Sequence, residues 1–229
     1  MYEELLAIGN AVSQDIVSNM DAIYEHLQTH KQWHKVTAIH NETLVSRQDD
    51  ADKVGLLQES GLKSVNEVKA DGDGDQDMAS FIDTSMAINM LTSTASRIND
   101  EFQRHIRLVM SSHGTFKAAP MKKVERSISK VENDYKDEQF PRAAKLLDLV
   151  RCSVTFNTVE QLCSGYVALI NHAKSKHGII ELARVKNGFL DPNDGGYRDI
   201  KVNVIFKSRN PEHRNVKMIC EVQLLLINY

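Results

Sequence analysis

The chain of 229 residues has few cysteines, and their arrangement excludes two classes of small stabilised domain. Cys152, Cys163 and Cys220 are odd in number, widely spaced and set in apolar surroundings. No Cys-x-x-Cys pair and no Cys/His zinc spacing occurs. A disulfide framework and a structural zinc site are therefore excluded, and we expect buried free thiols in a reducing compartment.

A strong net charge and a long apolar run are also absent. The formal charge of −3 gives no global basic field, so strong nonspecific binding to bulk nucleic acid is not expected, although local basic patches remain. No apolar run approaches the length that crosses a bilayer, and the N-terminal residues 1–4 are acidic where a signal peptide would be basic. These features favour a soluble cytoplasmic protein without a membrane partner, but an effector exported through a dedicated secretion machine could lack the same signals.

Helical periodicity dominates the first half of the chain. Apolar residues recur at helical intervals over 3–28 and again over 78–110. Between them the sequence is polar and weakly periodic, and it ends in an Asp- and Gly-rich run, which indicates a polar linker near 65–78. Residues 111–120 break the second helical pattern. We therefore expect a helical N-terminal region over 1–115.

The second half, 116–229, alternates between two periods. Helical spacing is found over 121–135, 141–147 and 159–174, whereas strand-like runs occupy 149–156, 179–185, 200–206 and 218–226. Asn and Gly residues at 187–188 and 193–196 are typical of turns. The sequence thus predicts an α+β fold, with a mixed β-sheet flanked by helices and preceded by the helical region.

Four motifs in this half carry side chains suited to phosphoryl transfer. Asp148 stands at the head of the first strand, and Glu221 interrupts an apolar strand, where burying a charge is costly unless it is paired or bound to a cation. Lys123 and Lys130 lie two helical turns apart, and Tyr197 follows two glycines. Phosphoryl transfer needs carboxylates for a hard cation, cations for the donor phosphates and a group that orients the acceptor.

Each motif also has a purely structural interpretation. The lysines suit the solvated face of a helix, Asp148 suits a turn before a strand, and Tyr197 could close a hairpin. The occurrence of all four in one half of the chain favours a site.

Together the four motifs resemble the nucleotidyltransferase domain of the RelA/SpoT family, the pyrophosphokinases that make guanosine alarmones. The resemblance covers about the last 110 residues. A lysine-rich helix with Ser-Ile between two lysines contacts the ATP phosphates in that family, and its counterpart here is 123–130. The family's Mg²⁺-binding aspartate begins the first strand, as Asp148 does. Its Gly-Tyr motif stacks the acceptor guanine, and its Glu-Val-Gln strand supplies an essential glutamate; Gly196-Tyr197 and Glu221-Val222-Gln223 match them.

The resemblance implies a Mg²⁺-dependent pyrophosphokinase that transfers the β,γ-pyrophosphate of ATP to the 3′-hydroxyl of a guanosine nucleotide. Asp148 and Glu221 would be catalytic and would bind the metal. The ATP-binding residues would be Lys123, Ser127, Lys130 and Arg151. The acceptor-binding residues would be Lys186, Gly196, Tyr197, Arg198 and Lys201.

The departures from the family pattern concern mainly the acceptor. Asp199 stands where the family has serine, Lys201 stands where it has histidine, and Arg151 comes two places early. Three alternatives therefore stay open: a tRNA end as acceptor, an adenosine nucleotide as acceptor, or a degenerate nucleotide-binding or interaction module. The family's hydrolase needs a His-Asp pair that does not occur here, so hydrolysis is not expected. Family members usually continue beyond the Glu221 strand into a helix, so a domain truncated at its C-terminus is one interpretation.

Overall fold

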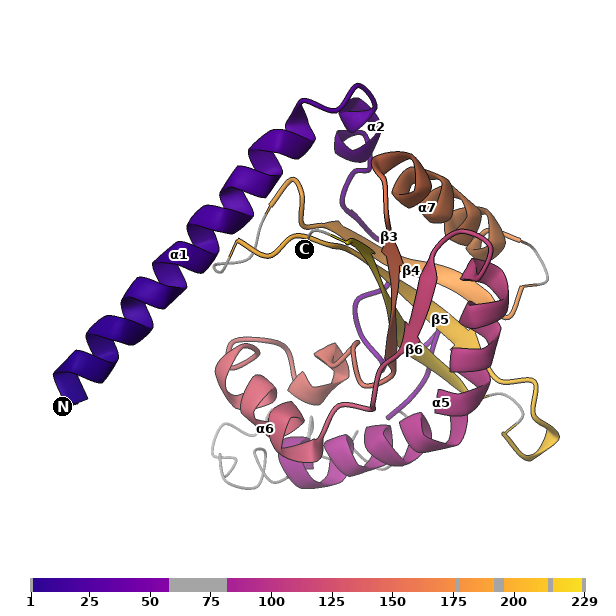
Figure 1. Ribbon diagram of the computed structural model, residues 1–229. Helices are drawn as coiled ribbons and strands as arrows, with labels where there is room; N and C mark the ends of the chain where they lie inside the picture. The colour runs from indigo at the N-terminus through magenta and orange to yellow at the C-terminus, as the bar shows by residue number, and fades with distance from the viewer. Residues whose placement is uncertain (1, 58–81, 176–177, 192–195, 214–215, 228–229) are drawn as a thin grey trace.

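The computed structural model describes residues 2–57, 82–175, 178–191, 196–213 and 216–227 (Figure 1). The predicted linker near 65–78 and the turn residues 193–195 lie outside these ranges. In chain order the elements are α1 (Tyr2–Gln28), α2 (Trp33–Thr37), β1 (Glu42–Thr43), the π-helix η1 (Ile82–Ala87), α5 (Ile88–Met110), β2 (Thr115–Ala118), α6 (Val124–Asn133), the 3-10 helix η2 (Arg142–Lys145), β3 (Arg151–Phe156), α7 (Val159–Ala173), β4 (Ile180–Asn187), β5 (Ile200–Lys207), the 3-10 helix η3 (Pro211–His213) and β6 (Lys217–Leu226).

The strands form one six-stranded mixed sheet in the order β1-β4-β5-β6-β3-β2. β3 and β6 pair in parallel, whereas the other neighbours are antiparallel. The predicted α+β class with a mixed sheet and flanking helices is confirmed. The break in the helical pattern expected over 111–120 is confirmed, because α5 ends at Met110. The break also contains an edge strand, β2, which pairs with β3 and which the sequence did not predict.

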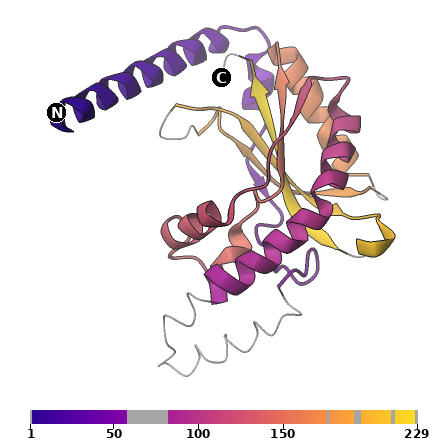
Figure 2. The ribbon, with the colours of Figure 1, turned by 60° about the horizontal axis from the view of Figure 1, so that its bottom comes forward.

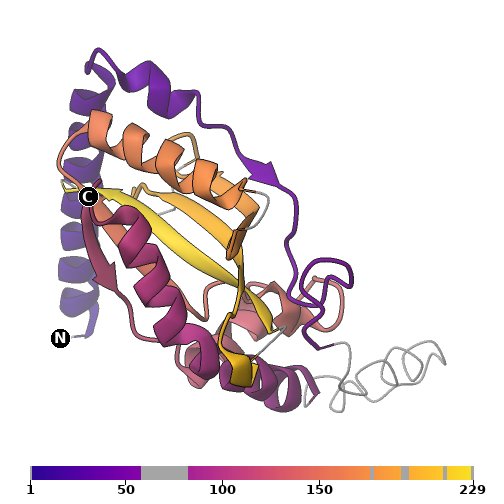
Figure 3. The same ribbon diagram turned by 90° about the vertical axis from the view of Figure 1, so that its right-hand side faces the viewer.

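One face of the sheet is covered by α5 and α7, which lie on the same side in Figures 1 and 3. Helix α5 buries a stripe with helical spacing, and alternate residues of β5 and β6 meet it. Phe102 of α5, for example, packs edge-on against Phe206 of β5, with the ring centroids 5.6 Å apart. Burying each such side chain stabilises the fold by about 1.5–3 kcal/mol.

This core joins the two halves of the chain. Buried residues from Trp33 to Leu226, on both sides of the predicted boundary at residue 115, belong to one apolar cluster. The domain division itself stays a prediction from the sequence pattern. Two of the expected buried thiols, Cys152 and Cys220, are buried, while Cys163 is half-buried, and all three are free.

The opposite face of the sheet carries polar side chains. On β5 and β6 the alternating residues Lys201, Asn203, Glu221 and Gln223 point away from the α5 and α7 side, as the period-two pattern predicts. A small apolar cluster that includes Ile205 and Ile219 fills part of this face.

No described helix has both the length and the apolar character that a membrane crossing requires.

Candidate functional site

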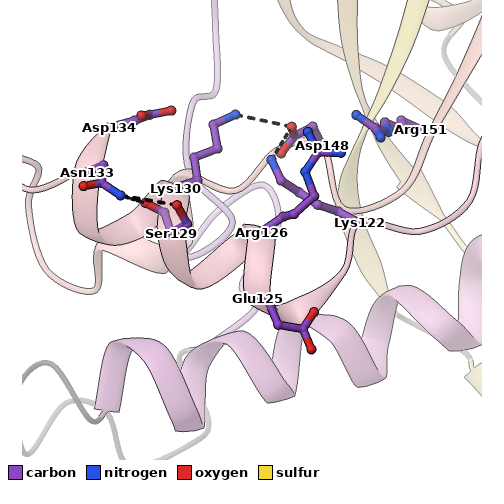
Figure 4. Close-up of a pocket in the computed structure, with 9 residues that line it drawn as sticks. All are labelled: Lys122, Glu125, Arg126, Ser129, Lys130, Asn133, Asp134, Asp148 and Arg151. Atoms are coloured by element: carbon purple, nitrogen blue, oxygen red, sulfur yellow. Dashed lines mark hydrogen bonds and ion pairs between the residues drawn. The ribbon is translucent and has the colours of Figure 1, made fainter. Parts of the chain in front are cut away.

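The polar face meets α6 at Asp148, whose carboxylate lies between two lysines. Lys122 Nζ donates to Asp148 Oδ2 at 2.7 Å, and Lys130 Nζ donates to the same oxygen at 3.3 Å (Figure 4). The side chains of Lys122 and Asp148 are only 7% and 13% exposed. The arrangement therefore holds one carboxylate and two cations together with little surrounding water.

Helix α6 explains why Lys122, and not the predicted Lys123, reaches Asp148. The helix begins at Val124, so both lysines precede it, and Lys123 has an extended backbone, which turns adjacent side chains to opposite sides. The Lys122 N–H donates to the Leu149 carbonyl at 3.1 Å, which places its side chain beside Asp148. Lys123 is exposed and does not line the cavity described below. The prediction that Lys123 and Lys130 project together was wrong because it extended the helix too far.

Ser127, another predicted ATP-binding residue, is fully buried under α6. Its hydroxyl donates to the Lys123 carbonyl at 3.1 Å, one turn earlier, so it serves the helix. With Val131 it forms the buried face that packs α6 onto the core. The residue that was predicted for the donor thus acts in packing.

An open cavity of about 550 Å³ lies over Asp148. Arg151 lines it, and Figure 4 shows the Arg126 side chain extending toward Asp148 while Glu125 points away. Most of the lining comes from α6 and its two flanking segments: Lys122, Glu125, Arg126, Ser129, Lys130, Asn133, Asp134, Asp148 and Arg151. The lining combines the cations Lys122, Arg126, Lys130 and Arg151 with three acids, of which Asp148 contacts two of the lysines.

The ionisation of this group is set by burial and by its neighbours. Burial alone would raise the pKa of Asp148, but the charges and hydrogen bonds of Lys130 and Lys122 lower it below the ordinary value. Burial lowers the pKa of Lys122, whereas Asp148 and Tyr135 raise that of Lys130 against the effect of its own burial. Asp148 is therefore an anion at neutral pH.

Glu221 lies on the neighbouring parallel strand. It is 5% exposed, and it pairs in register with Arg151 at the start of β3. Gln223 Nε2 donates to Glu221 Oε1 at 3.1 Å, which confirms that the two side chains share a face. Burial raises the pKa of Glu221, and the charge of Asp148 raises it further. The two predicted metal-binding acids thus interact electrostatically, and the protonated form of Glu221 is favoured more than in a surface glutamate.

The predicted acceptor residues lie at the ends of β4 and β5. Gly196 has a φ of 72°, as the glycine turn predicts. Tyr197 is half-buried, and burial together with the charges of Asp199 and Glu221 raises its pKa to about 12. The ring is therefore neither fully exposed nor buried in the core, and its role in stacking the acceptor base stays a prediction.

Two further predicted acceptor residues, Lys201 and Arg198, form ion pairs within the protein. Lys201 Nζ donates to Asp199 Oδ1 at 2.7 Å, and Lys186 lies opposite Lys201 in the β4–β5 pairing. Arg198 is 6% exposed, and its Nη2 donates to Asp21 of helix α1 at 3.0 Å. The structure therefore brings Tyr197 and Lys201 near Glu221 and Lys186 near Asp199, while Arg198 contacts α1.

Lys122, Arg126 and Asp199 also belong to the site, although the sequence motifs do not mark them. Lys122 could have been found only by starting the helix at Val124, one residue after Lys123. Asp199 was noticed as a departure from the family, and the structure shows it fully buried with its Oδ2 unpaired within the described ranges. Burial raises the pKa of Asp199 against the effect of Lys201.

The carboxylates fit a magnesium ion. Asp148 Oδ1 is buried and has no hydrogen-bond partner among the residues that the structure describes. In the same described part no three His, Cys, Asp or Glu side chains form a ready metal cluster. Mg²⁺ is usually held by one or two carboxylates together with substrate phosphates and water, so this donor set suits it.

Comparisons with known proteins give similarity of structure only. No model of a known protein family matches the sequence, and no curated protein matches it. Small alarmone synthetase 1 from Bacillus subtilis, bound to its product pppGpp, aligns over 58% of this chain and 69% of its own at 10% identity, with a TM-score of 0.48. A GTP pyrophosphokinase family protein from Streptococcus pneumoniae aligns over 67% and 71% at 13% identity, with a TM-score of 0.44.

The Type VI effector Tas1, solved with its immunity protein, aligns over 61% of each chain at 21% identity, with a TM-score of 0.42. Alarmone synthetases and GTP pyrophosphokinases are thus among the structures similar to this chain, as the motif resemblance predicts.

Proposed function

We propose that this chain is a Mg²⁺-dependent pyrophosphokinase that transfers the β,γ-pyrophosphate of ATP to the 3′-hydroxyl of a guanosine nucleotide. The observation that carries the proposal is the placement of Asp148. One of its oxygens is held by two lysines beside an open cavity, and the other is buried and unpaired within the described residues. A carboxylate for a hard cation beside cations for phosphate is the combination that phosphoryl transfer requires.

On the donor side, Lys122 and Lys130 would hold the ATP phosphates, with Arg126 and Arg151 beside them in the same cavity. An arginine can bind phosphate through two parallel hydrogen bonds, whereas a lysine acts as a compact charge. Asp148 and Glu221 would hold Mg²⁺. Bound there, the ion would neutralise the negative charge that develops on the transferred group.

On the acceptor side, Tyr197 would stack the base, and Lys186 and Lys201 would attract the acceptor phosphates. Glu221 would take the proton of the 3′-hydroxyl, because its raised pKa makes it a stronger base than a surface glutamate. The hydroxyl oxygen then bonds to the β-phosphorus of ATP while the bond from that phosphorus to the α,β-bridging oxygen breaks. AMP leaves, and no covalent intermediate with the protein forms. We propose that the reaction takes place in the cytoplasm, where both nucleotides are present.

Asp199 and Lys201 replace the serine and histidine of the family pattern, so the identity of the acceptor is tested with several candidate nucleotides and tRNA. The protein is incubated with Mg²⁺, ATP labelled at the γ-phosphate and one of GDP, GTP, ADP, unlabelled ATP or bulk tRNA. We expect label on the guanosine nucleotides and one AMP released for each transfer. Asp148→Asn and a reaction with EDTA are the controls.

The other outcomes separate the alternatives. Label on tRNA or on an adenosine nucleotide alone would replace the guanosine acceptor and keep the reaction. If no mixture releases AMP and calorimetry with Mg²⁺ detects no binding of ATP, the proposal is wrong. The protein is then a binding or interaction module.

A further inference from the structure

Helix α1 meets the rest of the protein at the turn that carries Tyr197. In Figures 1 and 2 the helix runs out past the sheet, with its C-terminal end toward α2. Arg198 Nη2 donates to Asp21 Oδ1 at 3.0 Å, and the Arg198 guanidinium lies 3.8 Å from the centroid of the Tyr24 ring. Since Arg198 is 6% exposed, these two contacts hold a cation that has been removed from water.

The ring of Tyr24 is itself fixed. Its hydroxyl donates to the Phe189 carbonyl at 3.0 Å, and its ring meets Trp33 edge-on at 5.7 Å. Trp33 in turn packs edge-on against the ring of Phe189 at 5.5 Å. Phe189 follows β4 and Arg198 precedes β5, so Tyr24 contacts the chain on both sides of the connection between these strands.

The backbone of the turn also lies directly against α1. Gly196 has a φ of 72°, and a Cβ atom added there would come 3.3 Å from the Met20 Cβ and 3.9 Å from the Val17 Cγ1. A side chain at this position would therefore need both a strained backbone and movement of the helix. Tyr197 stands between Gly196 and Arg198, and both of these neighbours are held by α1.

We infer that Asp21 and Tyr24 of α1 are positioning residues for the acceptor: through Arg198 they hold the turn that presents Tyr197. The inference rests on the proposed function, in which Tyr197 stacks the acceptor base. It gives α1 a role that the sequence did not indicate, and it assigns Arg198 to the support of the turn in place of contact with phosphate. Neither α1 residue touches the donor cavity.

Matched variants on one helix test this inference. Tyr24→Leu removes the ring face under Arg198, whereas Tyr24→Phe keeps the ring and removes only the hydroxyl. Asp21→Asn removes the charge that pairs with Arg198. Glu25→Gln is the control, since it makes the same change at an exposed acid one turn further along α1.

The first measurement needs no ligand. Hydrogen exchange at the amides of 197–199 should become about tenfold faster in Tyr24→Leu and several-fold faster in Asp21→Asn, with little change in Tyr24→Phe or Glu25→Gln. Exchange in β3 and β6 should stay the same in all four variants. Equal exchange in every variant, or faster exchange throughout the protein, would overturn the inference.

The second measurement separates acceptor from donor. Tyr24→Leu should raise KM for the acceptor about tenfold, with kcat and the KM for ATP within about twofold of the parent. An unchanged acceptor KM despite faster exchange of the turn would also overturn the inference. If the parent protein transfers no pyrophosphate, the proposed function is wrong, and so is the role of α1 in acceptor binding. Hydrogen exchange then decides by itself whether α1 holds the turn.

Discussion

The donor side and the acceptor side of the proposed site differ in how much open space adjoins their charged side chains. On the donor side, Lys122, Lys130 and Asp148 meet beside an open cavity, and the cations there face a space of about 550 Å³. On the acceptor side, Arg198 and Asp199 are buried, and Tyr197 is half-buried. The donor side thus has a largely buried ion pair at the edge of an open cavity, whereas the acceptor side is a packed turn in contact with α1.

The same contrast appears in the two carboxylates proposed to bind magnesium. Lysine neighbours lower the pKa of Asp148 despite its burial, whereas burial and neighbouring acids raise the pKa of Glu221. The folded protein therefore favours the charged form of Asp148, and it favours the protonated form of Glu221 more than water does. Two acids with opposite environments suit different roles, a constant charge and a proton acceptor.

The strongest test of this contrast is Asp148→Asn. We expect transfer to fall about 1,000-fold, because the charge that faces the donor phosphates and the cation is lost. We also expect a loss of about 3 kcal/mol in the free energy of unfolding, because the buried Lys122 loses its counterion. Activity assays and urea unfolding in EDTA measure the two effects.

The sign of the pH dependence is a control on the same variant. Because the pKa of Asp148 is lowered in the folded protein, its stabilising contribution is present above its ordinary pKa of 3.8 and disappears as the pH falls through the lowered value. The parent and Asp148→Asn should therefore approach equal stability in acid. A stability difference that persists there would contradict the ion pairing.

Glu221→Gln should lower activity and raise stability. We expect kcat to fall about 100-fold if Glu221 takes the acceptor proton, while the free energy of unfolding rises by about 1 kcal/mol. Because the pKa of Glu221 is raised in the folded protein, the gain should be absent below its ordinary pKa of 4.5 and grow as the pH rises through the raised value. If Glu221→Gln is less stable than the parent at neutral pH, neighbouring groups stabilise the charged form of Glu221 enough to offset its burial.

The sheet half of the fold could be predicted closely from the sequence. The alternation over 200–206 and 218–226 matches β5 and β6, and the separation of Val202 from Lys201 onto opposite faces follows from the period of two. Strand β2 could not be predicted, because a four-residue edge strand with mostly exposed side chains has no apolar alternation to mark it. Short edge strands are defined by their partner, which here is β3.

The candidate site was predicted in part, and the errors have physical causes. A cleft shared by Asp148 and the lysines was predicted, but which of the adjacent lysines faces it depends on where α6 begins, and helix ends are weakly encoded. The contact of Arg198 with Asp21 could not be inferred, because the two residues are 177 positions apart and no local pattern links them. Long-range packing decides such contacts.

The two adjacent lysines provide a sharper test of the donor side. Lys122→Met should weaken ATP binding about tenfold, because a charge-assisted hydrogen bond to phosphate is lost. Lys123→Met should change it less than about twofold, since that side chain is exposed and lies outside the cavity lining. Calorimetry with a non-hydrolysable ATP analogue measures both, with circular dichroism to check folding. The reverse order of effects would restore the family alignment at Lys123 and contradict the geometry.

Variants of Tyr197 test the acceptor side directly. Stacking of a base on an aromatic ring is worth about 1–3 kcal/mol, so Tyr197→Ala should raise the acceptor KM about tenfold and leave ATP binding nearly unchanged. Tyr197→Phe keeps the ring, and its effect should stay below about twofold. The hydroxyl has a pKa of about 12 and is neutral throughout the assay range, so the phenylalanine variant removes no charge.

The comparison of these two variants separates the ring from the hydroxyl. The charges of Asp199 and Glu221 both act on the hydroxyl, so that group could instead help to order the polar face. In that case Tyr197→Phe would impair transfer as much as Tyr197→Ala, and it would lower kcat without raising the acceptor KM. Stacking predicts the opposite division, with the loss confined to the alanine variant and to acceptor KM. If both variants match the parent, the turn held by α1 does not bind the acceptor, and only the donor side of the site remains supported.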